Sequence, residues 1–379
     1  MKLAVIAGAR PNFMKVAPLL HAIRRHNERC AEGNGALKPV LIHTGQHYDV
    51  MMSQVFFREL RIPDPDVNLE VGSGTHAAQT AGVMVRFESV CLKEPPDWVV
   101  VVGDVNSTLA CTLVAAKLGI PVAHVEAGLR SFDRTMPEEI NRLVTDALAD
   151  LLLTPSLDAD ENLRREGIPS ERIRRVGNIM IDTLTANLAE ARARRTYARL
   201  GLEAGRYAYV TLHRPSNVDR REALQGIMEN LVALSRELPV VFPVHPRTQK
   251  ALKAYGLDAL TGPGFHKIDP VGYHDSLCLA ENARLVLTDS GGLQEETTFF
   301  RTPCLTLRPN TERPVTLLEG SNRLTRLETL RADIEKVLNG PERLGRVPDL
   351  WDGRTAERIV RALVEARTCE PPCHRTMGP

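Results

Sequence analysis

This 379-residue sequence lacks several features that mark specialised classes of protein. It has no apolar run approaching the roughly 20 residues of a membrane-spanning helix. Lysine plus arginine (48) nearly equals aspartate plus glutamate (47), which leaves a net charge of +1. There is thus no basic excess to hold nucleic acid or an anionic membrane. We expect neither partner, and any phosphate binding must be local.

Cysteines are few and scattered. An odd count of seven argues against a disulfide framework. Cys369 and Cys373, beside His374, lack the second pair that a zinc site needs, so no metal is expected. Residues 1–8 are too short for a secretory signal and are expected to form a strand. A cytoplasmic protein fits these features.

The sequence does contain a regular alternation of short apolar strands and helices. Buried runs of Val, Ile and Leu between helices predict parallel sheets with helices on both faces. Strands are predicted at 3–7, 40–44, 98–102, 122–125 and 151–154, and in a second series at 207–212, 240–244, 284–288 and 304–307. The predicted fold class is α/β, with two doubly wound, Rossmann-like domains. Ligands would bind at the carboxyl ends of the strands, in the interdomain cleft.

The domain boundaries follow from these two series. The first domain is predicted to span residues 1–178 and the second residues 179–353. A final helix at 354–366 could pack on either domain, including back on the first. The Pro-rich residues 367–379 are expected to form a disordered tail.

A strand, a glycine-rich turn and a helix start follow one another in residues 285–296. Free N–H groups and the helix dipole favour an anion there, and glycines allow close approach. We therefore predict that Ser290, Gly291 and Gly292 hold a diphosphate and that Glu296 binds a ribose diol. The alternative is an ordinary loop with a serine cap.

A second anion-binding segment follows the first strand. Arg10 and Lys15 flank a predicted helix start and could pair with a diphosphate, although two surface cations would look the same. The turn has one glycine where a dinucleotide fingerprint needs three, so no NAD or other cofactor is expected. Residues 72–77 match G-x-G-x-x-A but follow a Pro-rich loop, and Thr75 is better explained as a helix cap.

Three carboxylates lie just past strand ends. Glu126 directly follows a predicted strand, Asp104 lies two positions after another, and Glu138 follows Pro137. Partial desolvation there could raise their pKa values toward the range needed for acid/base work. Asp104 could instead cap the next helix, and Glu138 could be a first-turn helix acid. Glu126 has the weakest structural alternative.

Two histidines end strands in the second half of the chain. His213 precedes Arg214, and His245 precedes Pro246 and Arg247. Both would face the predicted cleft. No close cluster of His, Cys and carboxylates favours a metal.

Together these segments resemble the nonhydrolysing UDP-N-acetylglucosamine 2-epimerases, from residue 1 to about 365. That family has the two-domain fold of one large class of nucleotide-sugar glycosyltransferases, termed GT-B. The segments that carry the resemblance are 8–12, 103–104, 124–130, 137–142, 213–214, 244–246, 288–296 and 311–314.

The resemblance implies that UDP-GlcNAc and UDP-ManNAc interconvert by inversion at C2. UDP would leave by anti elimination, giving 2-acetamidoglucal, and then add back. The acid/base residues would be Asp104, Glu126 and Glu138, with His213 also at the sugar. The UDP contacts would be Arg10, Lys15, His245, Ser290, Gly291, Gly292, Glu296 and Arg313. The family also implies a homodimer.

Three positions depart from the better-known members: Asp49, Pro215 and Val315. The first two replace groups suited to a second, activating UDP-GlcNAc, so we predict weak activation. The segment 43–49 also resembles relatives that epimerise UDP-2,3-diacetamido uronic acids. A hydrolysing 2-epimerase, a UDP-sugar glycosyltransferase and a non-catalytic UDP-sugar sensor remain as alternatives.

Overall fold

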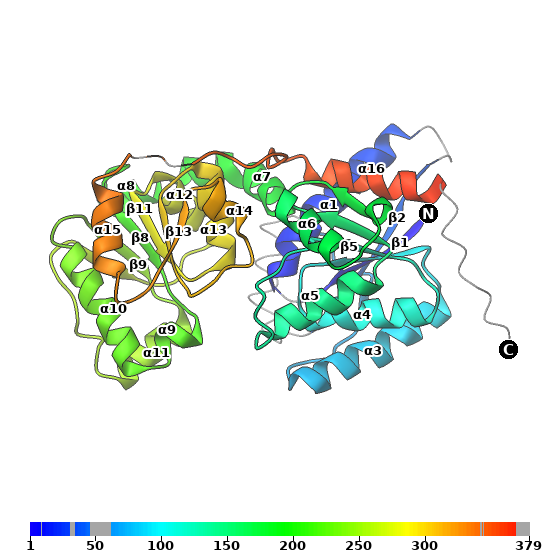
Figure 1. The fold of residues 1–379 in the computed structure, drawn as a ribbon, viewed down its shortest axis with the longest axis horizontal. Coiled ribbons are helices and arrows are strands. Elements are labelled where there is room, and N and C mark those ends of the chain that lie inside the picture. Colours follow the sequence, from blue (N-terminus) through cyan, green and yellow to red (C-terminus); the bar gives the residue numbers. More distant parts are fainter. Residues whose placement is uncertain (9, 31–34, 46–61, 342, 344, 369–379) are drawn as a thin grey trace. The chain divides into compact units, whose positions relative to one another are not determined.

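The computed structural model describes residues 1–8, 10–30, 35–45, 62–341, 343 and 345–368. The chain divides into two compact units (Figure 1). Unit 1 comprises Met1–Thr183 and Asp349–Pro379, and unit 2 comprises Leu184–Pro348. The sequence prediction placed the boundaries at 178/179 and 353/354. Residues 369–379 of the predicted tail, and Asp49, lie outside the described residues.

Unit 1 is built on a seven-stranded sheet in the order β3-β2-β1-β4-β5-β6-β7, and every neighbouring pair is parallel. Its central strands are almost entirely apolar and buried, as in a sheet covered on both faces. The strands are β1 Lys2–Ala7, β2 Lys38–His43, β3 Val67–Asn68, β4 Trp98–Val102, β5 Val122–Val125, β6 Leu151–Thr154 and β7 Ile173–Arg175.

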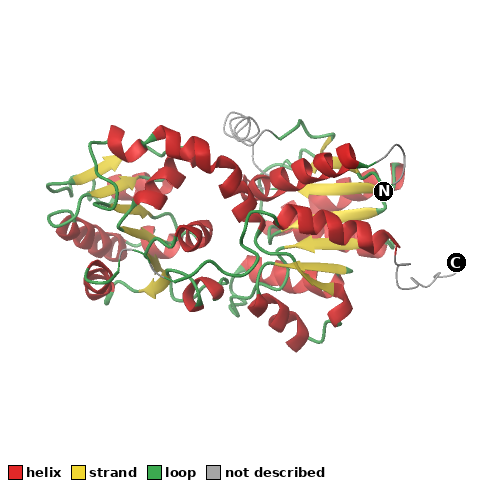
Figure 2. Ribbon diagram, turned by 90° about the horizontal axis from the view of Figure 1, so that it is seen from above, coloured by secondary structure: helices red, strands yellow, loops and turns green. Residues whose placement is uncertain are grey.

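Helices lie on either side of these strands (Figure 2). The sequence sets several of their starts. Thr75 caps α3 by accepting a hydrogen bond from the backbone N–H of Ala78, as predicted, and Pro137 opens α5, where a missing N–H costs nothing. The helices of this part are α1 Arg10–Arg29, α3 His76–Lys93, α4 Asn106–Lys117, α5 Pro137–Leu148, α6 Leu157–Arg165 and α16 Thr355–Thr368, with a short 3-10 turn at Ser170–Arg172. Helix α7 Ile179–Arg194 begins in unit 1 and continues into unit 2.

Unit 2 repeats the plan with six parallel strands in the order β10-β9-β8-β11-β12-β13. The strands are β8 Ala208–Thr211, β9 Val240–Pro243, β10 Phe265–Ile268, β11 Leu285–Thr288, β12 Cys304–Leu307 and β13 Asn322–Thr325. The helices are α8 Thr196–Arg199, α9 Pro215–Val218, α10 Arg221–Leu234, α11 Pro246–Ala254, α12 Tyr273–Asn282, α13 Gly291–Phe300, α14 Val315–Leu318 and α15 Leu330–Leu338. The prediction of two doubly wound, Rossmann-like domains is confirmed.

The C-terminal helix belongs to unit 1. In Figure 1 the red α16 lies beside the blue α1, against which it packs. Its start is fixed by Asp182, whose carboxylate accepts hydrogen bonds from the backbone N–H groups of Thr355 (3.0 Å) and Ala356 (2.8 Å). A carboxylate at that position satisfies the free donors of a first helical turn.

Two findings bear on the chain's surroundings. Within the described residues, no helix combines the length and apolar character needed to span a membrane. The described cysteines are free thiols, and all but Cys30 are buried: Cys30, Cys91, Cys111, Cys278 and Cys304.

Candidate active site

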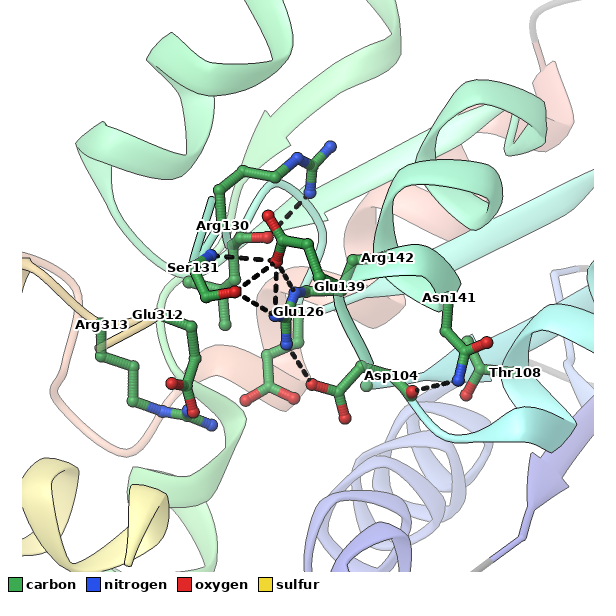
Figure 3. A network of polar contacts seen from close by, with 12 residues as sticks. Asp104, Thr108, Glu126, Arg130, Ser131, Glu139, Asn141, Arg142, Glu312 and Arg313 are labelled. Atoms are coloured by element: carbon green, nitrogen blue, oxygen red, sulfur yellow. Dashed lines mark hydrogen bonds and ion pairs between the residues drawn. The ribbon is translucent and has the colours of Figure 1, made fainter. Parts of the chain in front are cut away.

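Asp104 leaves the end of β4 and is held by Arg142 of α5, at 2.5 Å between Oδ2 and Nη1 (Figure 3). Its side chain is 30% exposed. The backbone carbonyl of Asp104 also accepts a hydrogen bond from the side chain of Asn141 (2.8 Å). The predicted alternative, a helix cap, is wrong, because α4 begins after Val105 without a side-chain cap.

Arg142 joins Asp104 to a second carboxylate, Glu139, which is buried (Figure 3). Glu139 Oε2 lies 2.5 Å from Arg142 Nη2 and also accepts hydrogen bonds from the backbone N–H and hydroxyl of Ser131. Burial alone would raise the pKa of Glu139, but these hydrogen bonds and the guanidinium hold it below its usual value. Glu139 is therefore ionised, and its carboxylate is bound by Arg142 and Ser131.

Glu138 precedes Glu139 in the first turn of α5, and it is exposed. Adjacent helical residues point about 100° apart, so Glu139 faces the interior and Glu138 faces away from it. A free carboxylate at a helix N-terminus is also favoured by the dipole. Of the two, Glu138 is the one able to meet a ligand.

Glu126 sits at the first position after β5 and is buried. Its backbone is left-handed (φ 74°), a strained conformation that clusters at functional sites. Its Oε2 forms an ion pair with the ammonium of Lys15, from α1. The structure thus brings together Glu126 and Lys15, which sequence analysis assigned separately to the sugar and the diphosphate.

Gly103 brings the end of β4 close to this ion pair. A Cβ added at Gly103 would lie 3.0 Å from Lys15 Nζ and 3.4 Å from Glu126 Oε2, and its φ of +69° also favours glycine. Asp104 is the residue that follows Gly103, so its backbone begins close to the ion pair of Lys15 and Glu126.

In unit 2, His213 follows β8 and is oriented by Asp289 at the end of β11. His213 Nδ1 lies 2.9 Å from Asp289 Oδ1, and the buried Asp289 also accepts from the backbone N–H of Arg214 (2.9 Å). Burial would raise the pKa of Asp289, but the hydrogen bond and charge of His213 keep it low. The ring is 41% exposed, so its other nitrogen can reach a ligand.

His245 lies beside His213, with 5.5 Å between ring centroids. It caps α11, its Nδ1 accepting from the N–H of Arg247 (3.2 Å). Arg10 is the first residue of α1, and the position of its side chain lies outside the described part.

The predicted phosphate turn opens α13. Ser290 is its N-cap, but the hydroxyl makes no capping hydrogen bond. A Cβ at Gly292 would meet nothing within 4 Å, whereas one at Gly291 would lie 3.1 Å from Arg313 Nη1. An arginine therefore lies against a helix N-terminus, a combination suited to a diphosphate.

The acids near this turn are neutralised. Arg313 bonds Glu295 (Nε to Oε1, 2.7 Å) and also pairs with Glu312. Glu312 has a second cation, Arg308, at 2.8 Å, so two guanidinium groups balance the two carboxylates. Glu296 is buried, and burial together with the charge of Glu295 raises its pKa to about 8. A protonated Glu296 does not repel a nearby phosphate, and it can both donate to and accept from a diol.

Sequence analysis missed Asp289, Arg142 and Glu139. Asp289 was interpreted only as part of the turn. On α5, the inward-facing set of Glu139, Arg142 and Asp146 follows helical spacing, a signal that was available. The described residues contain no group of three or more His, Cys, Asp or Glu placed to hold a metal ion.

Comparison with known proteins supplies the family. A family model described as UDP-N-acetylglucosamine 2-epimerase matches residues 29–364. The chain belongs to this family.

Similarity to individual members of the family extends over nearly the whole chain. The UDP-N-acetylglucosamine 2-epimerase of Methanocaldococcus jannaschii is 44% identical over 372 residues, covering 96% of this chain and 99% of the relative. The UDP-2,3-diacetamido-2,3-dideoxy-D-glucuronate 2-epimerase of Pseudomonas aeruginosa is 42% identical, covering 96% and 100%. A crystal structure of the M. jannaschii enzyme in complex with UDP-GlcNAc and UDP superposes with a TM-score of 0.85, covering 96% of this chain and 100% of that chain at 43% identity. The predicted family is confirmed.

Proposed function

We propose that this protein interconverts UDP-GlcNAc and UDP-ManNAc by inverting C2, with elimination and re-addition of UDP. The observation that supports it most directly is the grouping of Asp104, Glu126 and Lys15 at the carboxyl ends of β4 and β5. The C2 proton of a sugar is not acidic. Removing it as UDP leaves requires carboxylates at C2 and cations at the diphosphate.

The site residues have two kinds of role. Ser290, Gly291, Gly292 and Arg313 bind the diphosphate, helped by Arg10, Lys15 and His245, and Glu296 binds the ribose. Asp104, Glu126 and Glu138 exchange protons at C2, and His213, held by Asp289, meets the sugar.

The ion pair between Lys15 and Glu126 gives this assignment a physical consequence. The ammonium of Lys15 is paired with Glu126 Oε2. A diphosphate would compete for the same cation and weaken its hold on the carboxylate. The Glu126 carboxylate is then released from the ammonium and can contact the C2 proton. Binding of the leaving group would thus prepare the base.

Incubation with UDP-GlcNAc alone in D2O tests the reaction. UDP-ManNAc should form with deuterium at C2 of both epimers, without added metal or NAD. A glycosyltransferase or a sensor would give no UDP-ManNAc, and a hydrolysing enzyme would release free ManNAc and UDP. Product without deuterium at C2 would exclude the elimination route.

The Glu126→Gln substitution tests the assigned base. Gln keeps the shape but cannot titrate, so turnover should fall by ~10²-fold or more. Calorimetry should still detect UDP binding. Unchanged turnover would remove Glu126 from the mechanism.

A second candidate substrate is a UDP-2,3-diacetamido uronic acid. It is favoured by the 42% identity with the P. aeruginosa enzyme, close to the 44% with the M. jannaschii one. Comparison of kcat/KM for the two UDP-sugars decides which is the substrate. The two sugars share UDP and the group at C2 and differ from one another at C3 and C6.

We further infer a cytoplasmic homodimer. Free thiols support the compartment. Exposed apolar side chains support self-association: Val85 and Leu92 of α3 are each 66% exposed and Ile140 of α5 is 48% exposed. Sedimentation of Val85→Glu/Leu92→Glu should show a smaller species than the parent, and an unchanged mass would exclude this surface.

A further inference from the structure

His124 is a fully buried residue of β5, two positions before Glu126. Both of its ring nitrogens are engaged. Nδ1 lies 2.6 Å from Asp146 Oδ1, on α5, and Nε2 lies 2.8 Å from the backbone carbonyl oxygen of Gly103. The ring therefore connects three segments: the end of β4, β5 itself and α5.

The partners determine where the ring protons lie. Asp146 also accepts hydrogen bonds from the N–H of Gly128 (3.0 Å) and from Arg130 Nη1 (2.7 Å). Both of these donors reach Oδ2 and one of them is a buried guanidinium, so the Asp146 carboxylate is ionised. His124 Nδ1 must then donate to it. The Gly103 carbonyl can only accept, so Nε2 must also donate. Both nitrogens carry a proton, and the ring is a cation.

The surrounding charges balance this cation. Arg130 forms a two-pronged contact with Glu166 (2.8 and 2.6 Å) as well as its bond to Asp146. The cluster thus holds two cations, His124 and Arg130, and two carboxylates, Asp146 and Glu166. A buried charge is tolerated when it is paired and hydrogen-bonded in this way.

The Gly103 carbonyl belongs to the turn that leads from β4 into Asp104. Gly103 N donates to the carbonyl of Val125 (3.0 Å), so both polar backbone groups of this glycine are held by residues of β5. The left-handed turn at Gly103 sets its close approach to Lys15 and Glu126, and Asp104 is the next residue.

We propose that His124 is a cationic positioning residue that fixes the Gly103–Asp104 turn against Glu126, and so aligns the carboxylates that act at C2. The inference rests on the proposed function. His124 itself does not touch the substrate. Its effect is on turnover, because a displacement of about 1 Å at reacting groups can cost ~10²-fold.

Two substitutions separate the two contacts of the ring. The amide nitrogen of His124→Gln reaches close to where Nε2 lies and can still donate to Gly103, whereas that of His124→Asn lies near Nδ1 and can donate only to Asp146. We expect kcat to fall by ~10²-fold in His124→Asn and by ~10-fold or less in His124→Gln, with KM little changed. Equal kcat values, or a more active Asn variant, would overturn the proposal.

A matched control is His274→Asn in unit 2. His274 is buried and also bonded at both nitrogens, with Nε2 2.8 Å from Asn187 Oδ1 and Nδ1 3.3 Å from Arg194 Nη2. Its loss should lower the unfolding midpoint while kcat is retained. If His124→Asn lost no more kcat than His274→Asn, a general packing defect would explain both.

NMR of the wild-type protein with 15N-labelled histidine provides a test that needs no variant to fold. Near neutral pH, His124 should show two protonated ring nitrogens with similar 15N shifts, and a neutral tautomer would overturn the proposal. This readout also separates the two failures. If the proposed function fails, the wild type shows no epimerisation. If only this inference fails, an active enzyme shows a neutral ring or the reversed order of Gln and Asn variants.

Discussion

Replacement of Glu296 by Gln should change how the stability of unit 2 responds to pH. Glu296 is buried in α13, and its pKa is raised from 4.5 to about 8 by burial and by Glu295. The folded chain therefore binds this proton more tightly than the unfolded chain. The stabilising effect is complete below pH 4.5 and is lost as the pH rises through about 8. The difference in pKa corresponds to on the order of 5 kcal/mol, of which roughly 3 kcal/mol falls between pH 5 and pH 8.

Urea unfolding at about pH 5 and about pH 8, without ligand, measures this effect. Both tryptophans, Trp98 and Trp351, belong to unit 1, so fluorescence follows unit 1 while circular dichroism follows both units. In the wild type, the unit 2 transition should move to lower urea as the pH rises. In Glu296→Gln, which cannot titrate, the change in the free energy of unfolding of unit 2 between the two pH values should be smaller by roughly 3 kcal/mol. The fluorescence transition, which reports unit 1, should respond to pH as in the wild type.

The control is Glu222→Gln, an exposed change on α10 that removes one carboxylate from the same unit. It accounts for the loss of a negative charge without the loss of a buried proton. If Glu296→Gln and the wild type responded equally to pH, Glu296 would be ionised in the folded chain. Glu296 would then carry a negative charge beside the turn at residues 290–292.

Three further predictions test the geometry of the site. Gly103→Ala should lower stability by about 1–3 kcal/mol in urea melts and also lower turnover, because φ is +69° and the new Cβ would lie 3.0 Å from Lys15 Nζ; a neutral effect would show that the turn can relax. Arg142→Met should cost about 3 kcal/mol by leaving the buried Glu139 without its cation, and a cost equal to that of Arg165→Met, whose side chain is 74% exposed, would contradict this. Asp289→Asn should reduce kcat by ~10-fold or more, because His213 loses the carboxylate that fixes its ring, while UDP binding by calorimetry persists; a matching loss of UDP affinity would instead place Asp289 in nucleotide binding.

The strands that sequence analysis found and missed differ in one physical respect. Each strand found, such as β4 or β11, lies inside its sheet, where both faces are covered and the sequence is a continuous apolar run. The four missed strands, β3, β7, β10 and β13, are the outermost strands of the two sheets. Edge strands are short and partly polar, as in Ile173-Arg174-Arg175 of β7. Apolar periodicity therefore predicts the centre of each sheet better than its margins.

The candidate site shows a comparable division. Residues placed one or two positions after strands, such as Asp104, Glu126 and His213, were found because the position itself indicates function in parallel sheets. The residues that hold them, including Arg142 and Asp289, act through contacts between segments distant in sequence. Propensity and spacing do not encode such contacts. Which of Glu138 and Glu139 faces the interior depends on how α5 is rotated about its own axis, and the structure supplies that rotation.

The placement of α16 has a consequence for how the chain is made. Unit 2 is an insertion within unit 1, whose last segment begins at Asp349. During synthesis, unit 2 can complete its sheet while α1 still lacks the helix that covers it. Unit 1 can complete its fold only after Thr355 and Ala356 have been synthesised and can donate hydrogen bonds to Asp182, which was synthesised earlier. A nonsense codon after unit 2 but before residue 355 would therefore leave unit 1, most of which is made first, without its last helix.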